Sequence, residues 1–495
     1  MKVLMLGWEF PPHISGGLGT ACFGLTKGLA SHGVEVLFVV PKARGDEDAR
    51  FVTIVGANQV AIEEVVSTPK SRIVEERVEE GTTIDERDIV VPASAHVPAD
   101  ESSVRLQRTF EILAIDSLLK PYLSEREYIV RLREKEIEVR APSHTGTSIE
   151  TQTITLRRRI PWRKVLREVR EVDADPIKRR RVLEFSGGYG TNLMEEVARY
   201  ALAVEQIATR REFDVIHAHD WMSVPAGLAA ARASKKPLVV HVHACEHDRS
   251  GDKVNREVKA IEQLGLDGAD RIVCVSHYTA GQLRRHYKID DSKVRVVHNA
   301  LTQKEQKERV KVEKSIDEPI VLFLGRVTFQ KGPDYFLEAA SRVIRVRPKV
   351  KFVIAGSGDM LSSMIERTAR MGLARNVHFT GFLQGEDVER MYAMADVYVM
   401  PSVSEPFGIS PLEAMALDTP VILSRQSGVS EVLRNALKVD FWDVQDMANK
   451  ILALLAYPAL QEQLTDEGRE EVRAMRWETP AGLVRDAYVE LVGAR

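Results

Sequence analysis

The sequence predicts an α/β protein of two doubly wound domains that face each other across a cleft. Two observations predict this fold. A β-α alternation occurs twice, on either side of a charged stretch near residue 310, and 495 residues exceed what one hydrophobic core usually serves. The first alternation is also interrupted, so the first domain should carry an insertion. We expect a first domain over residues 1–305, a second over 317–475 and a C-terminal helix over 476–495.

The first domain opens with a strand, a loop, a helix and a second strand. Residues 3–7 form a short apolar run, residues 11–19 a loop rich in Gly and Pro, and residues 20–32 have helical spacing that stops at Gly33. The next apolar run follows at residues 34–40. Regularity returns with a helix over 192–211 and strands over 214–218, 237–243, 271–275 and 294–297. Such alternation is typical of a parallel sheet covered by helices.

The second domain repeats this pattern after a charged, strand-poor stretch at 302–318, which we interpret as a linker. Its apolar runs predict strands over 320–324, 350–355, 377–380, 397–400 and 420–423. Ligands of doubly wound sheets bind beyond the carboxyl ends of the strands, and clefts between domains are favoured pockets. Both domains are therefore expected to be Rossmann-like, with a site in the cleft.

The insertion covers roughly residues 53–185. It is rich in charge and in short alternating runs such as Thr151 to Thr155, so we expect it to be partly β. A basic stretch from Arg157 to Arg181 has acidic residues interspersed. This pattern favours a solvated or subunit-contacting surface, and binding of a polymer or an anionic effector is the alternative. A homo-oligomer stays open on the same grounds.

Composition excludes several classes of protein. The formal net charge is -3, whereas a nucleic-acid binder would normally show a strongly basic domain. The three cysteines (Cys22, Cys245 and Cys274) have no paired short spacing, which argues against a disulfide framework or a structural zinc site. The first apolar run is too short for a signal peptide, and no stretch approaches the roughly 18 uncharged residues of a membrane span. We expect a cytoplasmic protein without a transmembrane segment.

The strongest local signal is the string Ser404–Ala416, directly after the predicted strand 397–400. Glu405 and Glu413 stand eight positions apart, the second in the first turns of an apparent helix, with Gly408 and Ile409 between them. Glycine lets a backbone approach a ligand closely, and a helix N-terminus presents free N–H groups to an anion. Glu413 could accept both hydroxyls of a ribose. The string predicts a nucleotide site.

A cationic pair, Arg326 and Lys331, follows strand 320–324 in the same domain. A nucleoside diphosphate that leaves a sugar builds up negative charge, which an Arg fork and a Lys point charge can stabilise without a metal. Gly356 ends the next strand in a G-S-G turn that does not complete a dinucleotide fingerprint. Its loop could support the nucleotide base or make a tight turn, and both readings stay open.

These strings resemble the retaining glycosyltransferases of the two-Rossmann-domain (GT-B) type, especially the branch with glycogen and starch synthases. The resemblance covers nearly the whole chain except roughly 53–185. In that family the first glutamate of the E-x7-E motif lies against the donor sugar and the second contacts the ribose, which implies Glu405 and Glu413. The Arg and Lys that bracket the donor diphosphate match Arg326 and Lys331.

Part of the first domain resembles the same family. The string from His217 to Trp221 looks like the H-x-H-D-W of glycogen synthases, and Val242-His243 looks like their T-V-H, which implies that His243 lies beside the anomeric carbon. Histidines at buried strand ends are more often structural when no context is given. Four histidines on two neighbouring strands (His217, His219, His241 and His243) suggest a metal site, but no spacing matches a familiar zinc pattern. We expect neither metal nor cofactor, because the nucleotide sugar is a substrate.

Smaller matches complete the resemblance. The loop at residues 7–19 resembles the family's Gly-rich first loop, so backbone amides at Gly16 and Gly17 would reach the diphosphate. Glycogen synthases usually have Lys two residues before that Gly pair, where this chain has Ile14, which weakens the case for a glucan acceptor. Ser276 and Asn299, like Asp220, are candidates to line the cleft, with a helix cap and a turn as structural alternatives for the first two. In the family the last helix crosses back onto the first domain.

The resemblance implies a glycosyltransferase that retains the donor's anomeric configuration. Transfer of glucose from ADP- or UDP-glucose to an α-1,4-glucan is the leading hypothesis, and a retaining transferase with another sugar or lipid-linked acceptor is the alternative. A nucleotide-sugar epimerase of similar architecture is a remote third reading. A noncatalytic sugar-binding module fits less well, because the Arg326/Lys331 and Glu405/Glu413 sets together serve bond cleavage and donor binding.

Overall fold

The computed structural model describes residues 1–13, 17–66, 71–89, 154–172, 177–190, 192–301 and 316–493. The chain divides into two compact units. The first comprises Met1–Gln59, Leu119–Val130 and Phe185–Arg495, and the second comprises Val60–Leu118 and Arg131–Glu184. The predicted linker lies outside the described residues from 302 to 315.

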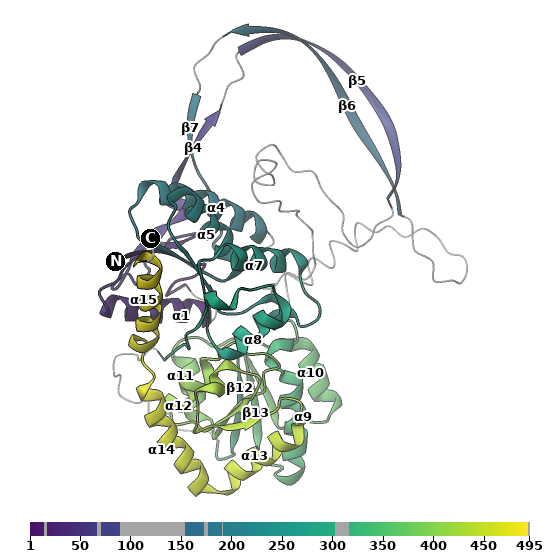
Figure 1. The fold of residues 1–495 in the computed structure, drawn as a ribbon. Helices are drawn as coiled ribbons and strands as arrows, with labels where there is room; N and C mark the ends of the chain where they lie inside the picture. Colours follow the sequence, from purple (N-terminus) through teal and green to yellow (C-terminus); the bar gives the residue numbers. More distant parts are fainter. Residues whose placement is uncertain are drawn as a thin grey trace, which may run out of the picture. The chain divides into compact units, whose positions relative to one another are not determined.

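The first unit contains two separate parallel sheets (Figure 1). The first sheet has seven strands in the order β11-β10-β9-β8-β1-β2-β3. The strands are β1 (Lys2–Leu6), β2 (Glu35–Val40), β3 (Thr53–Gly56), β8 (Val215–His219), β9 (Leu238–Val242), β10 (Arg271–Cys274) and β11 (Val294–Val296). β1 has β2 on one side and β8 on the other, so the strand order reverses there. Such a switch point is where doubly wound sheets bind their ligands.

Helices cover this first sheet. They are α1 (Gly17–Ser31), α4 (Leu193–Arg210), α5 (Asp220–Ser234), α6 (Glu246–Ser250), α7 (Arg256–Gly268) and α8 (His277–His286). The central strands β8 and β9 are buried along their whole length because helices pack on both faces. We call this sheet and its helices, together with the last helix of the chain, the first-sheet domain.

The second sheet has six strands in the order β14-β13-β12-β15-β16-β17. They are β12 (Ile320–Leu324), β13 (Lys351–Ala355), β14 (Val377–Gly381), β15 (Val397–Met400), β16 (Val421–Ser424) and β17 (Leu437–Val439). β12 pairs with β13 on one side and with β15 on the other, which puts a second switch point between β12 and β15. The two sheets confirm the predicted fold class.

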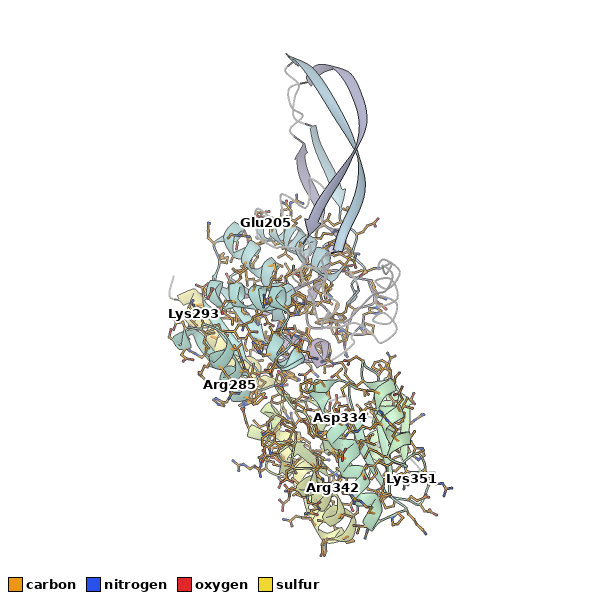
Figure 2. The ribbon with its side chains drawn as sticks, turned by 90° about the vertical axis from the view of Figure 1, so that its right-hand side faces the viewer. Glu205, Arg285, Lys293, Asp334, Arg342 and Lys351 are labelled. Atoms are coloured by element: carbon orange, nitrogen blue, oxygen red, sulfur yellow. The ribbon has the colours of Figure 1, made fainter. Side chains whose placement is uncertain are left out.

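The second sheet is covered by α9 (Pro333–Val346), α10 (Leu361–Arg370), α11 (Glu386–Met394), α12 (Ser410–Ala416), α13 (Val444–Ala456) and α14 (Pro458–Ala474). These elements make up the second-sheet domain. In α9 the apolar residues Phe336, Leu337 and Val343 face the core, whereas Asp334 and Arg342 lie outside it (Figure 2). This one-sided burial follows from the 3.6-residue period of the apolar positions.

The last helix, α15 (Glu478–Gly493), packs against α1 of the first-sheet domain (Figure 1). Two glycines of α1 allow the close approach. A Cβ atom on Gly24 would lie 2.1 Å from the indole Nε1 of Trp477, and one on Gly28 would lie 2.5 Å from the carbonyl oxygen of Trp477. Tyr488 of α15 is completely buried in the same core. The chain therefore ends on the domain in which it begins.

The first sheet extends further into the predicted insertion than expected. Thr53–Gly56, placed at the start of that insertion, forms β3 and pairs in parallel with β2. The second unit begins at Val60. The short edge strand β17 also lacks a counterpart among the predicted strands.

The second unit contains two antiparallel strand pairs. β4 (Ala61–Val66) pairs with β7 (Ile177–Val182), and β5 (Ser71–Ile89) pairs with β6 (Ile154–Val172). In this register Asp85 is paired with Arg158 and Glu86 with Arg157. The alternating run from Thr151 to Thr155, which led to the prediction of a partly β insertion, begins at residues 151–153, outside the described residues.

Among the described residues, no helix is long and apolar enough to cross a membrane.

Candidate active site

Four predicted residues lie on the two loops that leave the switch point of the second sheet. Arg326 and Lys331 follow β12, and Glu405 and Glu413 follow β15. The two strands are neighbours, with Val321 paired to Val397 and Leu322 to Tyr398. Because both strands are parallel, their carboxyl ends open on the same edge of the sheet. The tertiary structure thus brings together two loops that are separated in the sequence by two strands.

Lys331 and Glu405 form an ion pair on these loops. Glu405 is 6% exposed and also accepts a hydrogen bond from Ser402 Oγ at 3.1 Å, whereas the Lys331 side chain is 22% exposed. A carboxylate this deeply buried is costly unless it is paired, and Lys331 supplies the pairing charge. The lysine keeps access to solvent and thus to a ligand.

The backbone around Glu405 is fixed as an extension of the sheet. Its N–H donates to the Gln426 carbonyl at 2.9 Å, and its own carbonyl accepts from the Gly428 N–H at 2.9 Å. Gly408 then reverses the chain with φ of +98°, and a Cβ atom there would lie 3.0 Å from Glu405 Cγ. Glycine is favoured at such a positive φ because it has no side chain. The next residue, Ile409, packs against the cores of both sheets.

Glu413 lies in the first turn of α12 and is partly buried. Its Oε2 accepts a hydrogen bond from the Tyr392 hydroxyl at 3.3 Å. Burial raises the pKa of Tyr392 well above its usual value, and the negative charge of Glu413 adds to this shift. Tyr392 therefore remains a protonated donor at neutral pH and holds the Glu413 carboxylate at the helix start.

Arg326 is exposed, and its Nη2 donates to Gln330 Oε1 at 3.3 Å. Gly356 lies beneath this loop with φ of +145°, and a Cβ atom there would lie 1.8 Å from the Gly325 carbonyl oxygen. The Val327 N–H also donates to the Ser357 carbonyl at 2.9 Å. The close approach of two backbones is enough to require glycine at position 356. Contact of Gly356 with the donor stays a prediction.

The central strands of the first sheet end in a cluster of four histidines. His217 Nε2 and His241 Nδ1 share a hydrogen bond of 3.1 Å, and His219 Nδ1 and His243 Nε2 share one of 2.9 Å. His217 Nδ1 also hydrogen-bonds the hydroxyl of Tyr488 in α15. The rings stack along each strand, with centroids 4.4 Å apart on β8 and 4.3 Å apart for His241 and His243.

Burial lowers the pKa of all four imidazoles below the usual value. The neighbouring rings add to this effect for His217, His219 and His241, whereas Asp220 opposes it for His243. A cluster of positive charges could not be accommodated in this core, so the four rings are neutral at pH 7. Histidines and a tyrosine far apart in the sequence thus form one neutral network, which a search for local motifs cannot detect.

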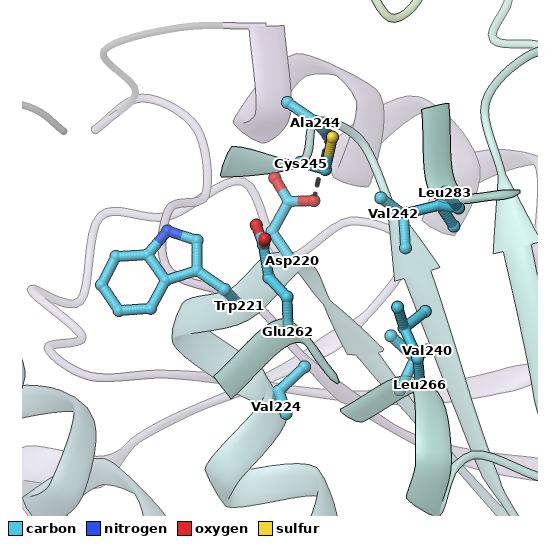
Figure 3. A pocket seen from close by; sticks show the side chains of 10 residues that line it. All are labelled: Asp220, Trp221, Val224, Val240, Val242, Ala244, Cys245, Glu262, Leu266 and Leu283. Carbon is cyan, nitrogen blue, oxygen red and sulfur yellow. Dashed lines mark hydrogen bonds between the residues drawn. The ribbon is translucent and has the colours of Figure 1, made fainter. Parts of the chain in front are cut away.

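Asp220 begins α5 with φ of +57°, in the left-handed region that non-glycine residues rarely occupy. Its Oδ1 accepts a hydrogen bond from the His243 N–H at 2.7 Å. The same oxygen accepts one from the Ala244 N–H at 3.3 Å (Figure 3). This residue therefore fixes the backbone that follows β9. Behind it lies a cavity of about 10 Å³ with an apolar lining, too small for a sugar.

The remaining predicted residues lie at the edges of this arrangement. Ser276 caps α8 by accepting from the Thr279 N–H at 2.9 Å, and its hydroxyl also donates to the Pro406 carbonyl of the other domain at 2.5 Å. Asn299 is partly buried beyond β11. Gly17 is exposed at the start of α1, with open space where a side chain would point. Gly16 and Ile14 lie outside the described residues.

Three groups of side chains in the described part of the chain could hold a metal ion. They are Cys22 with His219 and His243, His217 with His219 and His241, and His13 with Asp46 and Glu47. In the first two groups the imidazoles already hydrogen-bond one another, and burial raises the pKa of the Cys22 thiol, which opposes thiolate formation. This chemistry gives no reason to require a metal, and the expectation of a metal-free site stays a prediction.

Three family models match the chain. Residues 2–86 match the starch synthase catalytic domain, residues 137–303 match glycosyltransferase family 4, and residues 304–471 match glycosyl transferases group 1. Together these models span most of the chain, including the first-sheet elements at 2–86 and the loops that carry Arg326, Lys331, Glu405 and Glu413.

Curated relatives include proteins named as glycosyltransferases and a glycogen synthase. An uncharacterized glycosyltransferase of Methanocaldococcus jannaschii is 35% identical over 237 residues, which cover 45% of this chain and 60% of the relative. A D-inositol 3-phosphate glycosyltransferase of a Nocardioides species is 27% identical over 59% of this chain and 70% of the relative. A glycogen synthase of Mycobacterium tuberculosis is 25% identical over 59% and 72%. The match to the first of these thus covers less than two thirds of that protein.

Solved structures share the fold at low identity. Sucrose-phosphate synthase from Thermosynechococcus elongatus superposes with a TM-score of 0.60 at 18% identity and full coverage of both chains. TarM superposes with a TM-score of 0.61 at 14% identity over 98% of each chain. Anabaena HepE in complex with UDP-glucose gives 0.52 at 18% identity over 60% of this chain and 84% of that one. The two parallel sheets and these superpositions show that the chain has the GT-B fold.

Proposed function

We propose that this protein transfers a hexose from a nucleotide-sugar donor to an acceptor hydroxyl with retention of anomeric configuration. The observation that carries the proposal is the Lys331–Glu405 ion pair beside Arg326 at the switch point of the second sheet. One relative by fold is solved with UDP-glucose, which supports a nucleotide-sugar donor. Transfer of glucose from ADP- or UDP-glucose to an α-1,4-glucan is the leading specific form, in line with the starch synthase match and the mycobacterial glycogen synthase.

The donor diphosphate would compete with Glu405 for Lys331. A diphosphate carries more negative charge than one carboxylate, so it would draw the lysine away, with the exposed Arg326 fork as a second cation. Both cations would then stabilise the charge that builds up on the leaving group. Glu405, released from its ion pair, could accept hydrogen bonds from the hydroxyls of the donor sugar. Glu413 would accept from the ribose.

His243 would act on the sugar side of the reaction. The sugar carbon becomes positively charged in the transition state, and a cationic imidazole beside it would oppose that charge. Burial keeps His243 neutral, so its ring can hydrogen-bond a sugar hydroxyl, or its carbonyl can face the carbon. Asp220 holds the His243 N–H and thus orients this segment. The acceptor hydroxyl would attack the sugar carbon from the face that the diphosphate leaves and would give its proton to the departing diphosphate oxygen, so retention would need no covalent glycosyl-enzyme.

Screening nucleotide sugars with and without acceptor tests the proposal. We expect nucleoside diphosphate to be released only when an acceptor such as glycogen is present, and the product to keep the anomeric configuration of the donor, read by NMR. An inverted product would contradict retention. Interconversion of the nucleotide sugar without acceptor would instead indicate an epimerase, and binding without any turnover a sugar-binding module.

A second acceptor class is supported by Ile14 and by the inositol-phosphate glycosyltransferase among the relatives. Ile14 stands where glycogen synthases usually have Lys. The same screen with inositol phosphates and lipid-linked acceptors in place of glycogen separates these acceptors. Turnover with one of them and none with glycogen would exclude the glucan form while leaving the donor chemistry intact.

Turnover is expected to need no divalent metal, because Arg326 and Lys331 provide the charge that a metal would otherwise supply. Dialysis against a chelator should leave the rate of transfer within about twofold of the untreated rate, since no cation would be lost from the site. Loss of activity that Mg²⁺ or Mn²⁺ restores would contradict this expectation.

A further inference from the structure

Asp248 of the first-sheet domain reaches the loop that carries Glu405 in the second-sheet domain. Its Oδ1 accepts a hydrogen bond from Ser404 Oγ at 2.6 Å, and its Oδ2 accepts from the Cys245 N–H at 2.8 Å. Asp248 is 1% exposed and Ser404 is 8% exposed. We propose that Asp248 is a positioning residue that acts through Ser404 to hold Glu405 in place for glycosyl transfer; this inference rests on the proposed function.

The Asp248–Ser404 hydrogen bond connects the first-sheet part of the candidate site directly with the second-sheet part. On one side, Ser404 directly precedes Glu405, and the neighbouring Val403 N–H donates to the Gln330 carbonyl at 2.9 Å, one residue before Lys331. On the other side, Asp248 lies five residues after His243 in the same short segment. A shift of Ser404 would therefore move the Glu405 and Lys331 loops relative to His243.

The segment between His243 and Asp248 is held by two carboxylates in turn. Asp220 binds the N–H groups of His243 and Ala244, and Asp248 binds that of Cys245. A carboxylate that merely caps the short helix α6 would need only its Oδ2 and could remain at the surface. Asp248 is instead buried, which raises its pKa, and its second oxygen contacts the other domain.

A buried ionic network makes α6 a firm support for this contact. Arg249 Nη2 lies 2.6 Å from Glu262 Oε1, and Arg249 Nη1 donates to the Ala244 carbonyl at 2.9 Å. Glu246 accepts from Ser250 Oγ at 2.6 Å and from the Asn255 N–H at 2.9 Å. A helix of five residues is not stable by itself, so these contacts must fix its position.

Ser404 is also held from the side of α8. The Tyr278 hydroxyl donates to Ser404 Oγ at 3.0 Å and itself accepts from Gln282 Nε2 at 2.9 Å. With Tyr278 donating to it, the Ser404 hydroxyl directs its own proton to Asp248. Both partners of Ser404 thus belong to the first-sheet domain, although Ser404 belongs to the loop of the second. The loop that carries Ser404 and Glu405 is therefore held by hydrogen bonds to the opposite domain.

A second contact between the domains provides a matched control. Glu431 of the second-sheet domain accepts from the His277 N–H at 2.9 Å, the Tyr278 N–H at 2.6 Å and His298 Nε2 at 2.8 Å. It joins the same two domains as Asp248 does but touches neither Glu405 nor Lys331 in these contacts. If any contact between the two domains had the same effect, replacing Glu431 would lower kcat as much as losing the Asp248–Ser404 hydrogen bond.

The test compares Ser404→Thr with Ser404→Val. The two side chains have nearly the same shape, so any steric disturbance is shared, and only threonine keeps the hydroxyl. We expect kcat of Ser404→Val to fall at least tenfold relative to Ser404→Thr. Donor binding, measured by calorimetry with the nucleoside diphosphate, should change less than threefold, because the diphosphate contacts lie on Arg326 and Lys331. Glu431→Gln should keep kcat within about threefold of wild type. A threefold change in kcat corresponds to about 0.7 kcal/mol of activation free energy.

A double variant measures whether Asp248 and Ser404 act together. Adding Asp248→Ala to Ser404→Val should lower kcat no further than the poorer single variant, because one bond is lost only once. Three outcomes would each overturn the inference. They are an equal kcat for Ser404→Thr and Ser404→Val, additive losses of kcat in the double variant, and an equal loss of kcat in Glu431→Gln. Thermal melting identifies a variant that fails to fold, and the Thr/Val pair then decides alone. A wild type without acceptor-dependent transfer would overturn the proposed function, and the inference with it.

Discussion

The central strands of the two sheets end in opposite kinds of chemistry. Those of the first sheet end in four imidazoles, three of them buried and that of His243 partly buried, all with lowered pKa values. Those of the second end in a charged group: Lys331 and Glu405 form an ion pair and Arg326 is exposed. The same strand-loop-helix architecture therefore places neutral imidazoles at the first sheet and an ion pair at the second.

This difference has a physical cause. Burial disfavours the charged form of an isolated group, and the first-sheet histidines have one another as partners rather than carboxylates. In the second sheet each buried charge has an opposite charge within contact. Under the proposed function, the nucleoside diphosphate would bind at the charged loops of the second sheet, and the sugar with its developing positive carbon would lie beside the neutral histidines of the first.

Removal of either charge of the Lys331–Glu405 ion pair should have the largest effect on kcat. We expect Lys331→Ala or Glu405→Ala to lower kcat by about 10²–10³-fold, the usual cost of losing one group that stabilises transition-state charge. The exposed lysine Lys349 offers a matched control, and Lys349→Ala should leave kcat within about twofold because it lies away from the loops. Rates of acceptor-dependent diphosphate release measure this, with circular dichroism to show intact folding. Near-normal transfer by both site variants would contradict the charged role of this edge.

The loops that carry the charges should be sensitive to backbone packing. Gly356→Ala places a Cβ atom against the Gly325 carbonyl at a positive φ, so we expect it to lower the free energy of unfolding by about 3 kcal/mol. Gly281→Ala is the control. That glycine lies in α8 with no atom near its missing side chain, and alanine should stabilise the helix there by up to about 1 kcal/mol. Urea denaturation measures both, and equal stability of the two variants would refute the packing argument.

Glu413 should matter for binding more than for turnover. Its proposed partner is the ribose, which does not change in the reaction, so Glu413→Gln should raise the donor KM about tenfold and leave kcat within about threefold. Glu366→Gln, on the exposed face of α10, serves as the control. A fall in kcat at unchanged KM would mean that Glu413 acts on the reacting sugar instead.

The neutral histidines should make stability depend on pH below about 6.5. Their folded pKa values are depressed, so the stabilisation is fully present above the unfolded pKa and is lost as pH falls, because the unfolded chain takes up protons that the folded chain does not. Each such histidine contributes about 1.4 kcal/mol per pH unit in this window. His219→Asn should reduce the slope of unfolding free energy against pH by about that amount.

A buried tyrosine provides the control for this pH dependence. Tyr200→Phe removes hydrogen bonds to the Gly7 and Val39 carbonyls and should lower stability at every pH without a change of slope. The comparison of variants is needed because burial raises the pKa of Glu262 to about 7, which works in the opposite direction. An unchanged slope in His219→Asn would show that His219 is protonated in the folded protein.

Much of the fold could be predicted because its signals are local. The predicted strands at 320–324 and 397–400 coincide with β12 and β15, since an uninterrupted apolar run between breakers marks a buried parallel strand. The edge strands β3 and β17 were not predicted, although the edge strands β11 and β14 were, so an edge position by itself does not hide a strand. The positions of Glu405 and Gly408 on a loop and of Glu413 at a helix start could also be predicted, because these residues closely follow strand 397–400 in the sequence.

The sequence by itself thus determined the order of strands and helices and the residue types on the loops after each strand. Only the tertiary structure decided which of those residues meet. Lys331 pairs with Glu405 across 74 positions, Asp248 meets Ser404 across 156, and His217 meets Tyr488 across 271. Such contacts depend on sheet order and on the packing of whole elements, which no short window of sequence contains. The neutrality of the histidines has the same origin, because burial that lowers a pKa exists only in the folded chain.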